Sequence, residues 1–219
     1  MRQTVLSAAD GIGTLPGTLP RRLAFWAVAA LFSAYARSPL DPGKPITQLR
    51  HDVWGTEDGL PQNTVPAIIQ TRDGYLWLGT ELGLVRFDGL RFTVFDKRNT
   101  PELKSNAIFT LLEDRQGNLW IGTNGGGLTR FRDGQFQSYG VREGLSGGVV
   151  LCLYEDPSGA LWIGTDGGGL NRFSQGQFTV YGTKDGLADN TVFALAQQPD
   201  GTLTASGVAV CKDGLVPPM

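Results

Sequence analysis

The alternation of apolar runs with turn-forming residues predicts short strands along most of the chain. Three successive runs illustrate the pattern: Leu161–Thr165, Leu170–Phe173 and Gln177–Tyr181. The separators include the triple glycine at 167–169, and glycine readily adopts the positive φ that a reversing chain needs. A further strand is predicted before each such group, at Ile108–Glu113 in one stretch and at Val192–Gln197 in another. The unit is therefore four strands joined by tight turns.

This unit is repeated with a period of about 42 residues. The motif Trp-(Leu/Ile)-Gly-Thr occurs at 77–80, 120–123 and 162–165, and (Asp/Glu)-Gly-Leu at 58–60, 143–145 and 185–187. Residues 114–145 and 156–187 share 20 of 32 positions. Four strands per repeat at this period are typical of a β-propeller blade. We predict an all-β fold of four-stranded antiparallel sheets, as an incomplete arc or a small propeller.

Blade boundaries follow from the register of the repeat. We expect blades at 61–103, 104–145 and 146–187, and a degenerate fourth at 188–216. The fourth repeat matches the others if three residues, Trp-x-Gly, are missing between Leu203 and Thr204, which places Cys211 where the repeat has Phe87. Residues 51–60 match residues 178–187 in six of ten positions, so 48–60 is predicted to be an outer strand without its blade.

The N-terminal part has a different character. Leu23–Ala36 carries no charge, follows Arg21-Arg22 and ends in Ala-Tyr-Ala, a pattern that predicts a secretory signal over 1–36. The expected location is periplasmic or otherwise extracytoplasmic. An uncleaved inner-membrane anchor and a buried core helix are the alternatives. Residues 37–47, rich in proline, are predicted to be a linker.

Composition excludes several classes of function. The chain has 19 Lys and Arg against 21 Asp and Glu, so it offers no clustered positive charge for a nucleic acid. Its one histidine, His51, leaves most zinc sites and catalytic triads without an imidazole and is expected to be a strand residue. Cys152 and Cys211 fit no metal motif and are expected to be buried thiols, with a disulfide as the alternative. We predict no cofactor and no metal.

Some repeated residues resemble catalytic or binding motifs. The triple glycines lead into strands rather than a helix, so we interpret them as turns and not as phosphate loops. The carboxylate pairs Glu113-Asp114 and Glu155-Asp156 recur in successive blades and cannot form one site, so they are expected to stabilise turns. The repeated arginines that precede a strand Phe are expected to be solvated: Arg86, Arg130 and Arg172.

Repetition separates residues that build the fold from residues that could recognise a ligand. Residues found in every blade are predicted to be structural anchors: Trp77, Trp120, Trp162, Gly79, Gly122 and Gly164. Stacking of the tryptophans on a sugar is the alternative. The residue after the repeat Thr varies, and it lies in a turn on the propeller face also lined by Asn63, Asn106 and Asn190. We therefore predict ligand contacts at Glu81, Asn124 and Asp166.

The repeat resembles a known family. Residues 155–181 and 185–192 follow the pattern of the two-component regulator propeller repeat, and the resemblance covers residues 48 to 216. It implies the extracytoplasmic sensor of a hybrid histidine kinase, with oligosaccharides as frequent ligands. The kinase phosphoacceptor and ATP-binding motifs are absent from this sequence, so a sensing module of a two-component system, without enzymatic activity of its own, is expected.

Two other functions remain open at this point. One is a secreted propeller enzyme similar to quinone-dependent dehydrogenases, although the residues before Trp120 do not fit the docking motif of that family. The other is a protein-interaction scaffold that binds no small ligand. Four repeats are few for a closed ring, so we also expect self-association or pairing with other propeller blades.

Overall fold

The computed structural model describes residues 52–207. The predicted signal segment, the linker, His51 and Cys211 lie outside these residues, and so does the disulfide alternative. The described residues from Val53 to Gly207 belong to one compact unit, which is described below. Within the described part of the chain, no helix is long and apolar enough to cross a membrane.

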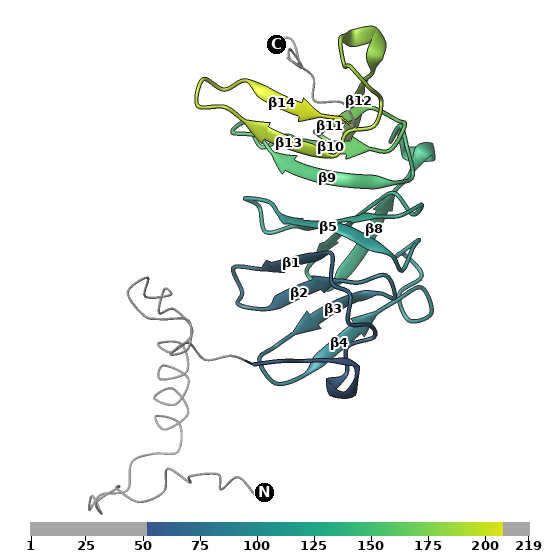
Figure 1. The fold of residues 1–219 in the computed structure, drawn as a ribbon, viewed down its shortest axis with the longest axis vertical. Helices are drawn as coiled ribbons and strands as arrows, with labels where there is room; N and C mark the ends of the chain where they lie inside the picture. The colour runs from purple at the N-terminus through teal and green to yellow at the C-terminus, as the bar shows by residue number, and fades with distance from the viewer. Residues whose placement is uncertain (1–51, 208–219) are drawn as a thin grey trace, which may run out of the picture. The chain divides into compact units, whose positions relative to one another are not determined.

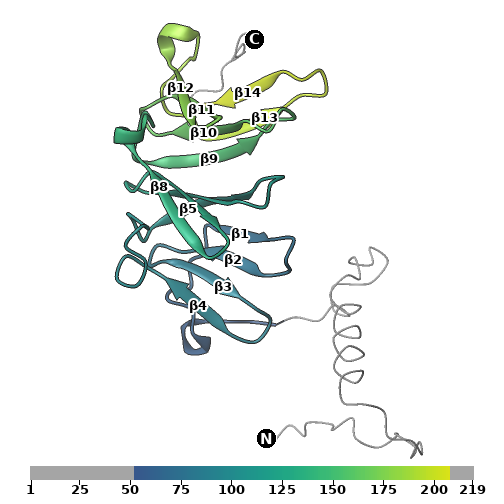
Figure 2. The ribbon, with the colours of Figure 1, turned by 180° about the vertical axis from the view of Figure 1, so that it is seen from behind.

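The unit consists of three four-stranded antiparallel sheets and a two-stranded sheet (Figures 1 and 2). The first blade contains β1 (Ala67–Gln70), β2 (Leu76–Gly79), β3 (Leu84–Phe87) and β4 (Phe92–Phe95). The second contains β5 (Ile108–Glu113), β6 (Leu119–Thr123), β7 (Leu128–Arg132) and β8 (Gln135–Tyr139). The third contains β9 (Val150–Glu155), β10 (Leu161–Thr165), β11 (Leu170–Ser174) and β12 (Gln177–Tyr181). The fourth contains β13 (Ala194–Gln197) and β14 (Leu203–Ser206).

Each sheet is a meander, and neighbouring sheets meet along their first strands. The strand order follows the chain in all four sheets, and β1, β5, β9 and β13 lie side by side in both ribbon views (Figures 1 and 2). These features confirm the predicted all-β propeller blades. A short 3-10 helix precedes the first, the third and the fourth blade. These helices are Thr56–Asp58, Val141–Glu143 and Thr183–Asp185, respectively.

The hydrophobic core lies between the sheets. One buried cluster joins Trp77 and Leu84 of the first blade to Ile108 and Ile121 of the second. Another joins the second and third blades, and a third joins the third blade to β13 and β14. A fourth cluster, with Leu60, Val85 and Phe87, lies within the first blade and the segment that precedes it. Three of the four clusters thus bridge two blades, so most of the core depends on neighbouring blades.

Close approach between blades explains the repeated Gly of the second strand. A Cβ on Gly79 would lie 2.7 Å from Ile108 Cγ2, and one on Gly122 would lie 2.6 Å from Val150 Cγ1. A Cβ on Gly164 would lie 2.6 Å from the Val192 carbonyl oxygen. These atoms belong to the segment that begins the next blade, and on Gly122 and Gly164 a Cβ would also clash with Thr110 Cγ2 and Cys152 Sγ of the same blade. The absence of a side chain at this Gly thus lets the segment that begins the following blade pack closely against the second strand.

The repeated Trp and Asp form a pair within the second and third blades. The indole Nε1 of Trp120 donates to Asp114 Oδ2 at 2.7 Å, and that of Trp162 donates to Asp156 Oδ2 at 2.8 Å. In the first blade Trp77 donates to the Thr71 hydroxyl at 3.2 Å. The carboxylates also accept backbone N–H groups of their own turns, as at Asn118. This arrangement gives the aspartates of the Glu-Asp pairs a structural role.

The glutamates of these pairs bind an arginine of the preceding blade. The Arg72 backbone N–H donates to Glu113 at 3.0 Å, and its guanidinium donates to the Asp114 and Arg115 carbonyls at 2.9 Å each. Arg115 repeats the contact one blade further, with its backbone N–H 3.0 Å from Glu155 Oε2 and its Nη1 2.8 Å from the Pro157 carbonyl. These inter-blade clamps were not predicted from the sequence.

The structure corrects the prediction of a three-residue deletion after Leu203. In the third blade Leu161 pairs with Glu155 and Trp162 with Tyr154, and in the fourth Leu203 pairs with Gln197 and Thr204 with Ala196. Thr204 therefore occupies the position of Trp162, and Ser206 that of Gly164. The amide Nε2 of Gln198 donates to the Thr204 hydroxyl at 3.1 Å, in place of the Asp–Trp pair. The motif is substituted in β14, not deleted.

The predicted outer strand at 48–60 also differs. Within its described part, residues 52–60, no strand is assigned, and residues 56–58 form a 3-10 helix. A strand needs a neighbouring strand to bond its backbone N–H and C=O groups, and no strand is paired with residues 52–60. It covers the first blade instead. Trp54 packs on Phe87 and Phe92 with ring centroids 5.0 and 6.2 Å away, and Leu60 is buried.

Candidate functional site

The blades present two opposite ends of their strands. The connection face carries the turns between second and third strands and the segments that link one blade to the next. The turn face carries the remaining hairpin turns. Glu81, Asn124 and Asp166 are all exposed in turns of the connection face, one in each of the first three blades.

The structure does not bring these three predicted ligand residues into contact with one another. Glu81 Oε2 accepts from the Gln62 amide at 3.1 Å, and Asp166 Oδ1 accepts from the Thr191 hydroxyl at 3.0 Å. Asn124 is held through its backbone, whose N–H donates to the Ala107 carbonyl at 2.8 Å. They form a row of exposed polar groups along a rigid frame.

The predicted structural anchors are inaccessible to a ligand. Trp77, Trp120 and Trp162 are only 2 to 3% exposed, so none of them offers a ring for a sugar to stack on. The arginines opposite them on the third strands are half-buried and lie over the indoles at 5.8 to 6.0 Å. The expectation that these arginines are solvated is therefore corrected: they pack on the indoles, where cation–π contact stabilises them.

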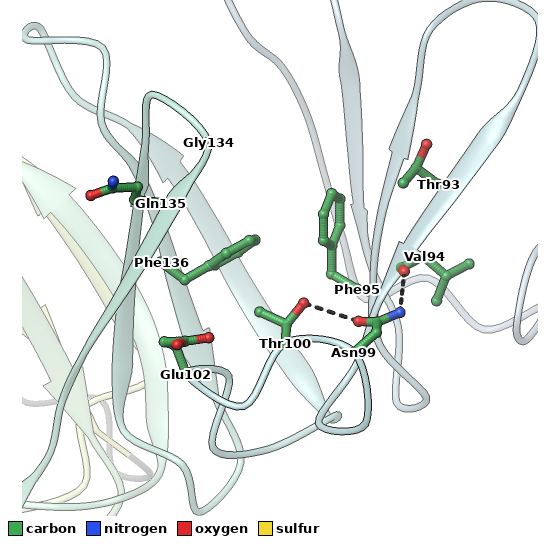
Figure 3. A pocket seen from close by; sticks show the side chains of 9 residues that line it. All are labelled: Thr93, Val94, Phe95, Asn99, Thr100, Glu102, Gly134, Gln135 and Phe136. Atoms are coloured by element: carbon green, nitrogen blue, oxygen red, sulfur yellow. Dashed lines mark hydrogen bonds between the residues drawn. The ribbon is translucent and has the colours of Figure 1, made fainter.

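A cavity lies at the outer rim between the first two blades (Figure 3). This rim cleft has a volume of about 690 Å³, within the range of small-molecule sites. Phe95 of β4 and Phe136 of β8 point toward each other from its two sides, with ring centroids 5.3 Å apart. Asn99, Thr100 and Glu102 of the connecting segment lie below them.

The segment that floors the rim cleft departs from the repeat. Twelve residues separate Phe95 from Ile108, whereas ten separate Tyr139 from Val150. In place of a 3-10 helix, Asp96 accepts the backbone N–H groups of Arg98 and Asn99. The Arg98 side chain donates to Asp96 at 2.6 Å and, with these N–H groups, holds the pKa of that carboxyl below its usual range.

Sequence reasoning missed the rim cleft, although a signal was present. The connection at 96–107 lacks the (Asp/Glu)-Gly-Leu motif that the other connections carry, and it has two additional residues. Most polar groups of its floor are already bound: Asn99 donates to the Val94 carbonyl and accepts from Thr100. The cleft can hold a small polar molecule, but it contains no pair of groups arranged for acid–base chemistry.

Cys152 and the metal-ligating side chains provide no reactive centre. Burial raises the pKa of the Cys152 thiol to about 12, and the thiol lies against Gly164 and the Val192 carbonyl. A thiol that stays protonated is a poor nucleophile. Among residues 52–207 no group of three His, Cys, Asp or Glu side chains could hold a metal ion.

Comparisons with known proteins agree with this geometry. Residues 59–81, 102–125 and 144–167 match the model of the two component regulator propeller. No curated protein matches the chain. The extracellular domain of the hybrid two component system BT3049 from B. thetaiotaomicron is 28% identical, with a TM-score of 0.56 over 68% of this chain and 20% of that one.

Two further solved structures show similarity of fold. The extracellular domain of the B. thetaiotaomicron system BT4673 is 22% identical, with a TM-score of 0.56 over 65% of this chain and 22% of its own. Virginiamycin B lyase from Staphylococcus aureus is 17% identical, with a TM-score of 0.53 over 68% and 51% of the two chains. This chain thus spans about a fifth of the two extracellular domains.

The lyase is an enzyme, but at this identity it shares only a fold with the chain. The matched repeats belong to sensor propellers, which points to a non-catalytic domain. Three segments of the described chain, one associated with each of the first three blades, are therefore similar to the two-component regulator propeller repeat.

Proposed function

We propose that the chain is a ligand-sensing propeller module of a two-component system and that it acts outside the cytoplasm. The observation that carries the proposal is the match of three segments to the two component regulator propeller model. The similarity to an extracellular domain of a hybrid two component system supports the location. The kinase that would respond is proposed to lie in another part of the signalling system.

The proposed ligand is an oligosaccharide or another small polar molecule, bound on the connection face by Glu81, Asn124 and Asp166. These residues vary at the position that follows the constant Thr of the repeat, as expected of recognition residues on a fixed scaffold. Carboxylate and amide groups suit the hydroxyl groups of such a ligand. Gln62 and Thr191, which bind Glu81 and Asp166, are themselves polar and would extend the same surface.

Isothermal calorimetry with a panel of oligosaccharides tests this proposal. The wild-type chain should bind at least one of them, and the Glu81→Ala/Asn124→Ala/Asp166→Ala variant should lose most of that affinity. Gln116→Ala is the matched control, because Gln116 is also exposed in a turn but lies on the turn face. Equal affinity of wild type and triple variant would disprove the site. Absence of binding to the wild type would favour a ligand-free scaffold.

A further inference from the structure

The rim cleft carries one negative charge that nothing in its lining balances. Of the nine residues that line it, Glu102 alone has a charged side chain. Within residues 52–207 this carboxylate forms no hydrogen bond and no ion pair. The side chain is exposed and lies below Phe136 in the cleft (Figure 3). The cleft therefore attracts a positively charged group.

The two cations nearest to Glu102 in the chain are bound elsewhere. Lys104 Nζ donates to the Pro101 carbonyl at 2.9 Å. The Arg98 guanidinium pairs with Asp96, with Nη2 2.6 Å from Oδ2. Neither Lys104 nor Arg98 lines the cleft. The Glu102 carboxylate is thus left to a cation from outside the described chain.

Aromatic rings form the wall beside this carboxylate. Phe95 and Phe136 point toward each other across the cleft, with ring centroids 5.3 Å apart (Figure 3). Both side chains are only half-buried and both line the cavity, so part of each ring is accessible to a ligand. The faces of aromatic rings attract cations, and organic ammonium groups above all.

Polar side chains on the other sides of the cleft could bind the remainder of such a ligand. Thr93 and Gln135 line the cavity, and within the described residues their side chains form no hydrogen bond. Asn99 and Thr100 are bonded to each other at 2.9 Å and form a fixed floor. The amide of Gln135 can both donate to and accept from a hydroxyl group.

We propose that the rim cleft binds a small organic cation, with its ammonium group at the Glu102 carboxylate and the Phe136 ring and its polar part toward Gln135. A lining whose only charge is negative disfavours an anion. A metal ion fits less well, because Ca²⁺ and Mg²⁺ need several oxygen ligands and the lining has one carboxylate. Choline is a suitable probe, since it joins a quaternary ammonium group to a hydroxyl.

The segment before the first blade supplies a matched control for Glu102. Glu57 is also an exposed glutamate, it lies in the 3-10 helix Thr56–Asp58, and it does not line the cleft. Glu57→Gln therefore changes the net charge of the chain as Glu102→Gln does, but leaves the cleft intact. A difference between the two variants reports on the position of the charge.

Titration of the full chain with choline chloride, followed by the amide signals of Gly134, Gln135 and Phe136 in nitrogen–proton correlation spectra, tests the proposal. Choline should shift these signals saturably. Sodium chloride should not, nor should dimethylbutanol, the neutral isostere in which carbon replaces the charged nitrogen. Glu102→Gln should weaken choline binding about 2- to 5-fold, as for an exposed ion pair, and Glu57→Gln should leave it unchanged.

Glu102→Lys reverses the charge and should abolish the saturable shift. Nuclear Overhauser contacts between the choline methyl groups and the Phe136 ring test the part of the ring in the wild type, without a core substitution. An unsaturable shift, an equal response to dimethylbutanol or equal binding by Glu102→Gln would overturn the proposal, and so would the absence of contacts to Phe136. None of these outcomes bears on the oligosaccharide site, whose three residues do not line the cleft.

Discussion

The junction between the second and third blades and the junction between the third and fourth share one framework but differ at two positions of the polar clamp. The first has Trp120, Asp114, Gly122 and Arg115 on its near side. The second has Trp162, Asp156 and Gly164, but Pro157 replaces the arginine. Both bury the indole of the near blade to 3% exposure. The polar clamp is thus dispensable for burial, whereas Trp and Gly are retained.

The far side of each junction changes in step with the near side. Glu155 faces Arg115, and Gln197 occupies the same position after Pro157. Gln197 accepts from the Tyr154 hydroxyl at 2.8 Å instead. A glutamate without an arginine would be a charge without its partner, so the neutral amide fits the altered neighbour. The residue at this position of the repeat therefore depends on the neighbouring blade as well as on its own.

The fourth blade lacks the Trp and Gly against which the following blade packs at the other junctions. Thr204 and Ser206 stand where the other blades have Trp and Gly. A Cβ at the equivalent Gly164 meets the next blade at less than 3 Å. The comparison indicates that Trp and Gly serve the following junction, and that a blade without them serves mainly the preceding one.

The largest effect should come from Trp120→Ala. The indole fills the space between the second and third blades, where it packs on Tyr139 and Phe173, and its loss also leaves Asp114 without its indole donor. We expect the free energy of unfolding to fall by about 3–5 kcal/mol, measured by denaturant titration. Thr204→Ala, at the same position of the fourth blade, should cost far less. Similar losses in the two variants would contradict the assigned register.

A smaller effect is expected for Arg115→Ala. The clamp consists of one charged hydrogen bond to a carbonyl and a weak ion pair with Glu155, and the arginine side chain is 54% exposed. We expect a loss of about 1 kcal/mol in the free energy of unfolding, after allowance for solvent screening.

Arg132→Ala is the control for the clamp. Its pair with Asp133 lies within one hairpin, with side chains 49% and 89% exposed, and bridges no blades. Its removal should change stability by less than about 0.5 kcal/mol. If Arg115→Ala costs no more than Arg132→Ala, the clamp is an incidental surface contact.

The fold was predictable from the sequence because its determinants repeat. Leu161–Thr165 and Gln177–Tyr181 are strands with the expected bounds, and the turns at 167–169 follow from their glycines. The fourth repeat was misaligned because sequence matching favoured the threonines, whereas strand pairing is decided by the turn at Gly201 and by Leu203. For aligning this repeat, the register that the turn imposes on the strand pair is a stronger constraint than identity of individual residues.

The candidate sites were less predictable, because they depend on contacts between blades. The position of Glu81, Asn124 and Asp166 on one face follows from strand order alone. The rim cleft depends on how the segment from Asp96 to Leu103 folds against β8, where the Ser138 hydroxyl donates to the Glu102 carbonyl.

The smallest expected effect is a difference in acid sensitivity between the third and fourth blades. Burial alone would raise the pKa of Asp156, but hydrogen bonds from Ser158, Trp162 and Ala160 outweigh it, so the pKa lies below its usual range. The ionised form is therefore favoured by folding. Its contribution is complete above the ordinary pKa of about 3.9 and is lost as the pH falls through the lower folded value.

The fourth blade has Gln198 at this position, which carries no charge at any of these pH values. Asp156→Asn makes the third blade resemble it and should flatten the acid limb of a plot of unfolding free energy against pH. Denaturant midpoints of wild type and Asp156→Asn should therefore converge as the pH is lowered. Parallel curves would show that the Asp–Trp pair acts through shape and neutral hydrogen bonding, and that its charge is immaterial to the junction.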